Sequence, residues 1–114
     1  MYYILVDKTI VPVSPLDWIN NYKGTNSIKR DELYDKEEQI NVSVSTVFLG
    51  INHDYNNSGT PILFETMIFG GKYSEYQNRY STYDEAIIGH QEACIMVDGR
   101  QKGREEKLND ILQK

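Results

Sequence analysis

Two apolar runs rich in β-branched and aromatic residues lie near the middle of the chain, at 42–49 and 62–69, and each ends at glycine. This composition is typical of β-strands, so the pattern predicts an antiparallel hairpin. The segment between the runs is dense in Asn, Asp, Ser, Gly and Pro, which favours a long exposed loop. Both strands carry apolar residues on both faces. We therefore expect a helix to cover one face and a second element or chain to cover the other.

A helical pattern follows the second strand. Thr82 and Glu85 fit a capping box, in which a hydroxyl and a carboxylate each satisfy a backbone N–H of the first helical turn. Apolar residues then recur at helical spacing and include His90 and Cys94. The pattern predicts a helix over 82–97 that packs on the sheet, with both of these residues in the core.

The N-terminal part predicts a second hairpin and a short helix. Residues 1–13 read as two short strands, with Pro12 restricting the second strand to an edge. Ser14 is a suitable N-cap for a helix near 15–23, because Pro15 at the first helical position loses no hydrogen bond. Residues 23–41 are rich in charge, and we interpret them as a solvated surface or loop that could bring Arg30 toward a central site.

The remaining segments are polar. The tyrosine-rich stretch before the long helix predicts a loop or a short strand, and a narrow apolar stripe near the end predicts a short C-terminal helix. At 114 residues the chain fits a single domain, 1–114. The predicted fold class is α+β: a small antiparallel sheet, built from the N-terminal hairpin and the central hairpin, packed with helices near 15–23 and 82–97.

The composition restricts the kinds of partner that we expect the protein to bind. The formal net charge is −5, which argues against binding to long nucleic acids because these need a basic surface. The first residues lack the basic start and the apolar length of a signal peptide, and no apolar run reaches membrane-spanning length. With one cysteine, an intramolecular disulfide is impossible. We expect a cytoplasmic protein with no membrane partner.

Candidate chemistry is sparse. His53, Glu65 and His90 are the residues that first suggest a metal, but no closely spaced ligand pair among them supports one, and we expect neither a metal nor another cofactor. No nucleophile, base and orienting group can be assembled, so we do not expect an enzyme. Arg79 and Tyr80 precede the capped helix, where free N–H groups attract anions. The alternative for Arg79 is a structural ion pair with Glu65 or a surface acid.

Three sequence blocks also resemble a known family. V-S-T-V-F-L-G-I-N-H, P-I-L-F-E-T-M-I-F-G-G and R-Y-S-T-Y-D-E-A-I-I-G-H are similar, in that order, to signature blocks of a widespread family of small proteins of tailed phages. With the preceding S-P-L-D-W, the resemblance covers roughly residues 10 to 95. We identify the family as the phage anti-CBASS nucleotide sponges. Asn52, where an acidic residue is expected, and Tyr83, where tryptophan is expected, depart from the pattern and put base preference in doubt.

The resemblance implies a host-cytoplasmic protein that binds a cyclic dinucleotide, such as 3′3′-cyclic GMP-AMP, without cleaving it, and thereby shields phage from host immunity. A pocket shared by two copies of the chain would suit so symmetric a ligand, and we expect a homodimer or larger homo-oligomer. A protein-binding inhibitor of a host factor is the alternative, and a nucleotide-cleaving enzyme is a weaker one. The positions carried over as ligand candidates are Thr46, Phe48, His53, Glu65, Arg79, Tyr80 and Thr82.

Overall fold

The computed structural model describes residues 2–21, 26–52 and 59–99. Within them, six strands and two helices follow one another along the chain. Their order is β1 (Tyr2–Val6), β2 (Thr9–Val13), α1 (Pro15–Asn21), β3 (Ser27–Asp35), β4 (Ile40–Phe48), β5 (Phe64–Phe69), β6 (Gln77–Tyr80) and α2 (Tyr83–Asp98). The fold is therefore α+β, as predicted. The predicted C-terminal helix lies outside the described residues.

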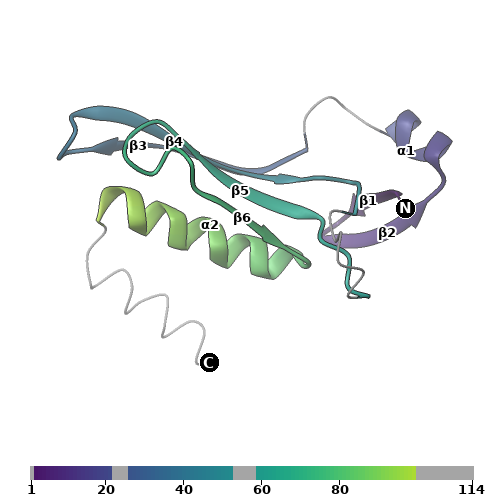
Figure 1. The fold of residues 1–114 in the computed structure, drawn as a ribbon. Helices are drawn as coiled ribbons and strands as arrows, with labels where there is room; N and C mark the ends of the chain where they lie inside the picture. The colour runs from purple at the N-terminus through teal and green to yellow at the C-terminus, as the bar shows by residue number, and fades with distance from the viewer. Residues whose placement is uncertain (1, 22–25, 53–58, 100–114) are drawn as a thin grey trace.

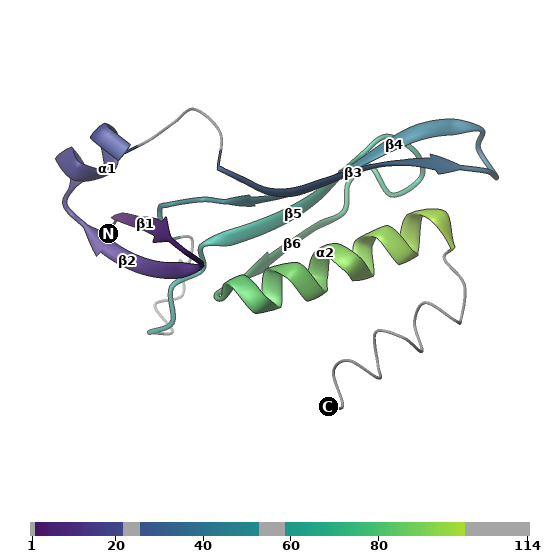
Figure 2. The same ribbon diagram turned by 180° about the vertical axis from the view of Figure 1, so that it is seen from behind.

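A four-stranded antiparallel sheet, in the order β3-β4-β5-β6, forms the centre of the fold. Figures 1 and 2 show α2 lying along one face of this sheet, while α1 and the N-terminal hairpin lie at one end. No described helix lies over the opposite face, which we call the open face. Because strand side chains alternate between faces, neighbouring residues of one strand point to opposite sides.

The central hairpin is confirmed as the pair β4 and β5. Its register runs from Ser43 opposite Phe69 to Phe48 opposite Phe64. The long helix is also confirmed: Thr82 is its N-cap with both capping-box bonds present, and Gly99 ends it in the left-handed conformation at φ 58°. Among the described residues, no helix has the length and apolar character needed to cross a membrane.

The N-terminal hairpin is confirmed but forms a sheet of its own. A two-residue turn joins β1 and β2, and both turn residues, Asp7 and Lys8, have positive φ, as a turn matched to strand twist requires. The hairpin meets the rest of the chain through the amide of Tyr3, which donates to the Gly50 carbonyl at 2.8 Å. We expected this hairpin in the same sheet as the central one, whereas two separate sheets are present.

Two buried clusters lie between the sheet and α2. The first cluster joins the C-terminal half of α2 to β4 and β5 through Val44, Ile68 and Ala93. The second joins the first turn of α2 to Phe48 of β4 and Phe64 of β5. The helical stripe predicted from sequence thus makes the core. The second predicted cover, over the open face, has no counterpart in the described part of the chain.

The interpretation of residues 23–41 as a solvated surface agrees with the described part, since most of residues 27–39 are exposed, but the alternative of a loop was wrong for residues 27–35. Residues 27–35 form β3, which pairs with β4 over nearly its whole length. Its many charges are typical of an edge strand, where they discourage pairing with other chains. A register shift between Ser27 and Lys29 also interrupts the alternation that would reveal a strand.

Candidate functional site

A buried polar chain crosses the interface between the sheet and α2. The hydroxyl oxygens of Thr46 and Thr66 are 2.6 Å apart, and Thr46 Oγ1 is 2.7 Å from His90 Nδ1. All three residues are fully buried. Burial of polar groups is tolerated only when they are hydrogen-bonded, and this chain satisfies each of them. Thr46, a ligand candidate, therefore serves the core, and His90 is a core residue as predicted.

Asp31 lies at the far end of this series of polar contacts, next to His90. Its Oδ2 is 2.7 Å from His90 Nε2, and the Cys94 thiol donates to the same oxygen at 3.6 Å. The hydrogen bond to His90 is the main cause that lowers the pKa of the Asp31 carboxyl below its usual value. Asp31 thus ties β3 to α2 by a polar contact.

A second polar cluster lies on the open face. Glu65 Oε2 accepts from Arg79 Nε at 2.9 Å and from Gln77 Nε2 at 2.6 Å. Glu65 and Arg79 are directly opposite each other on β5 and β6, and the Glu65 side chain is 11% exposed against 35% for Arg79. The structure therefore confirms the alternative interpretation of Arg79, an ion pair with Glu65. The pair gives the nearly buried carboxylate of Glu65 a charged partner, without which its burial would be costly.

The guanidinium of Arg79 is only partly used by this pair. Its ion pair with Glu65 runs through Nε, and the side chain is 35% exposed. The buried carboxylate fixes the orientation of the group. An arginine held in this way presents a planar fork that suits a phosphate.

Tyr80 lies on the other side of the sheet from Arg79. It follows Arg79 in β6, so its ring points toward α2, where it packs against the bare backbone of Gly89. Burial raises the pKa of the Tyr80 hydroxyl, which keeps the group neutral. Arg79 and Tyr80 are therefore not brought together as one binding surface, contrary to the arrangement we expected.

Thr82 is occupied by helix capping. Its hydroxyl accepts from the Glu85 amide at 3.1 Å, and Glu85 Oε1 accepts from the Thr82 amide at 3.1 Å. The cap uses donors of the first turn that were expected to attract an anion. His53, the remaining histidine candidate, lies outside the described residues.

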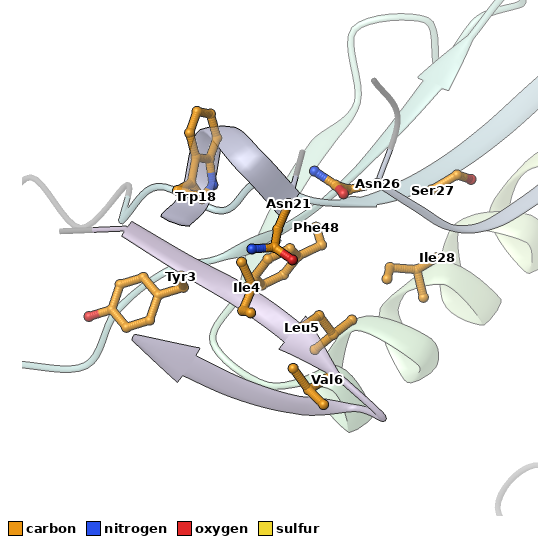
Figure 3. A pocket seen from close by; sticks show the side chains of 10 residues that line it. All are labelled: Tyr3, Ile4, Leu5, Val6, Trp18, Asn21, Asn26, Ser27, Ile28 and Phe48. Carbon is orange, nitrogen blue, oxygen red and sulfur yellow. The ribbon is translucent and has the colours of Figure 1, made fainter. Parts of the chain in front are cut away.

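Phe48 lines a cavity of about 360 Å³ between the N-terminal hairpin, α1 and the end of the sheet. Figure 3 shows Tyr3 and Trp18 around it, together with the amides of Asn21 and Asn26. None of the described lining residues is charged. The volume is at the small end for a ligand site, and the lining suits a ring with hydrogen-bonding edges better than a phosphate.

The structure therefore divides the described candidates into three groups. Glu65 and Arg79 meet on the open face, Thr46, Tyr80 and the helix cap Thr82 belong to the helix side, and Phe48 borders the cavity. Sequence reasoning missed Asp31, which is far from His90 in sequence. It placed His90 and Cys94 on one helical stripe but did not consider these two residues, four apart on one face, as a pair of possible metal ligands.

A further open-face cluster was not foreseen either. Arg30 donates to Glu32 Oε1 at 2.8 Å and to the Ser43 hydroxyl at 3.2 Å. Arg30 does reach the sheet's open face, but as part of β3 and within a salt bridge that is more than half exposed. Such exposed pairs contribute little to stability.

Comparisons with protein-family models, with curated proteins and with solved structures find no match for this chain.

Proposed function

We propose that the protein sequesters a cyclic dinucleotide without cleaving it, as the resemblance to the phage anti-CBASS sponges implies. The observation that carries the proposal is Arg79 on the open face, anchored through Nε by the buried carboxylate of Glu65. The terminal amino groups of the guanidinium then bind a phosphate of the ligand. An anchored arginine loses less conformational entropy on binding than a mobile one.

The open face also supports a pocket shared by two copies. A cyclic dinucleotide has two phosphates, and two copies meeting through this face bring two Arg79 residues to one ligand. Each copy presents acids and bases side by side there, Glu65 with Arg79 and Glu32 with Arg30, so the surfaces are complementary in charge. The half-exposed ring of Phe69, at 48%, adds apolar area that a partner covers.

Titration calorimetry against a panel of cyclic dinucleotides, 3′3′-cyclic GMP-AMP included, tests the proposal. Arg79→Ala should weaken binding by about 1.5–3 kcal/mol, or roughly 10- to 150-fold, because one charge-assisted bond to phosphate is lost. Arg30→Ala removes an arginine from the same face but from the opposite edge strand, so it measures the effect of charge on the shared face, and the difference between the two variants is the part specific to Arg79. Glu65→Gln keeps an oxygen that accepts from Arg79, so it isolates the contribution of the negative charge of Glu65 to ligand binding.

Three outcomes separate the classes of function. A bound ligand that a mass spectrum of the denatured protein returns intact supports sequestration. A ligand that disappears with turnover supports a nucleotide-cleaving enzyme. If no member of the panel binds the wild-type protein, the proposal fails. If ligands bind but Arg79→Ala has no effect, the function stands and the site is elsewhere, with the Phe48 cavity as the next candidate.

A protein-binding inhibitor is the second candidate, favoured by one observation. Helix α1 has no buried residue, and its Leu16 and Ile19 are 67% and 63% exposed. Exposed apolar side chains on a short helix are suited to a protein partner. Leu16→Ser with Ile19→Ser should leave nucleotide binding unchanged and abolish inhibition if this candidate is right.

A further inference from the structure

Three side chains with metal-binding atoms converge where β3 meets α2. They are Asp31, His90 and Cys94, and one ligand atom from each lies within 4.8 Å of the others. Asp31 Oδ2 is the common neighbour, at 2.7 Å from His90 Nε2 and 3.6 Å from Cys94 Sγ. Imidazole, thiolate and carboxylate together form a donor set that zinc accepts.

The two separations that involve Asp31 are close to those of a tetrahedral site, and the ligand atoms of His90 and Cys94 lie within 4.8 Å of each other. Zinc lies about 2.0–2.1 Å from nitrogen and oxygen and about 2.3 Å from sulfur, which places oxygen about 3.3 Å from nitrogen and about 3.5 Å from sulfur. The distance from Asp31 to Cys94 already agrees with this geometry. The distance from Asp31 to His90 requires a movement of roughly half an ångström. Asp31 is the residue that can move, since it lies on an edge strand with its side chain 35% exposed.

The surroundings of His90 match those of a metal ligand. A ligating histidine bonds its second ring nitrogen to a neighbour, which fixes the ring and its tautomer. Here Nδ1 of His90 is held by Thr46, and Thr46 is held in turn by Thr66. In the metal-free protein Nε2–H donates to the Asp31 carboxylate. A cation at this place would take the position of that proton, with Nδ1–H then donating to Thr46.

Access and charge are also suitable. His90 and Cys94 are fully buried, while Asp31 opens to solvent, so an ion enters past Asp31 and a water completes its coordination. A zinc ion with one carboxylate and one thiolate forms a neutral unit. Neutrality removes most of the cost of placing charge in the core.

We propose that Asp31, His90 and Cys94 bind Zn²⁺ and that the ion fastens β3 to α2. On binding, the Cys94 thiol releases its proton to solvent, and the proton on Nε2 of His90 is replaced by the ion while Nδ1 carries the proton that is donated to Thr46. Zn–S, Zn–N and Zn–O bonds form with no change of oxidation state. The inference is independent of nucleotide sequestration, because the three residues lie on the helix side of the sheet and Arg79 lies on the open face.

Titration of the purified, metal-stripped protein with Co²⁺ tests the site directly. Co²⁺ takes zinc sites and reports thiolate bonding by a charge-transfer absorption, which Zn²⁺ should abolish by competition. Asp31→Asn should weaken Co²⁺ binding by roughly tenfold or more while keeping a hydrogen-bond partner for His90. Cys94→Ser should remove the charge-transfer band.

Glu32→Gln is the matched control, because Glu32 neighbours Asp31 in β3 but faces the opposite side, where it contacts Arg30 and Ser43. It should bind Co²⁺ as the wild type does. Absence of the charge-transfer band in the wild type, or unchanged affinity in Asp31→Asn, overturns the proposal. Asp31 is partly exposed, so its variant should fold even if Cys94→Ser does not.

Discussion

Replacing Gly89 with alanine gives the sharpest test of where Tyr80 lies. A methyl group at Gly89 would overlap Oη, Cζ and Cε1 of the Tyr80 ring. Carbon atoms in contact normally stay about 3.5–4.0 Å apart, so the ring has to move. Its backbone resists, because Tyr80 pairs with Phe64 and its carbonyl accepts from the Leu63 amide at 3.0 Å.

The expected change in the free energy of unfolding is the overpacking cost minus the gain in helix propensity. Overpacking of this kind costs typically 1–3 kcal/mol, and three overlapping atoms place Gly89→Ala near the upper value. Alanine is better than glycine in a helix by about 1 kcal/mol, which offsets part of the cost. We therefore expect a loss of about 2 kcal/mol in the free energy of unfolding. For a domain of this size the melting temperature should fall by roughly 8–16 °C.

Denaturant unfolding of a double-mutant cycle measures the effect. In the Tyr80→Ala background the ring is absent, so Gly89→Ala should become stabilising by up to about 1 kcal/mol. Glu92→Ala, at an exposed position of the same helix, should change stability by less than about 0.5 kcal/mol. If Gly89→Ala is as stable as the wild type while Tyr80 is present, the ring does not pack there and Tyr80 returns to the list of ligand residues.

Three further outcomes are expected from equilibrium unfolding. Thr82→Ala should lose about 1 kcal/mol through the helix cap, with Thr82→Ser restoring it. His90→Ala should lose on the order of 1–3 kcal/mol, with nucleotide binding unchanged; lost binding at an unchanged melting temperature would contradict a core role. Because the pKa of Asp31 is lowered in the folded state, its contribution is present above about pH 4 and lost as pH falls through the folded value. Asp31→Asn should reduce the loss of stability at acidic pH, and an unchanged pH dependence would refute the contribution of Asp31.

Much of the fold could be predicted because its signals are local. The capping box of Thr82 and Glu85, the apolar stripe of α2 and the β-branched runs of β4 and β5 each depend on residues close in sequence. The edge strand β3 could not be predicted in this way. Ile28 and Leu33 are the apolar residues of β3 that pack against the buried clusters, and Asp31 and Asp35 take the positions on either side of Leu33.

The site was harder to predict because its contacts are long-range. The pair between Glu65 and Arg79 depends on the register of β5 against β6, which no local pattern specifies. The contact between Asp31 and His90 joins residues 59 apart. Only a strand assignment for residues 27–35 would have brought Asp31 to the helix face.

Side chains alternate between the two faces of the sheet along each strand, so neighbouring residues of the three sequence blocks have different surroundings. Thr46, Phe48 and Tyr80 point toward α2 or the cavity, so substitutions there act first on stability. Glu65 and Arg79 are turned the other way, onto a face that no described element covers, so the charge of Arg79 can change with less disturbance to the core. A set of variants measured for both melting temperature and nucleotide affinity should therefore separate by face. Affinity losses at constant stability on the helix side would mean that the ligand enters between the sheet and α2, and the binding surface proposed here would be on the wrong side of the sheet.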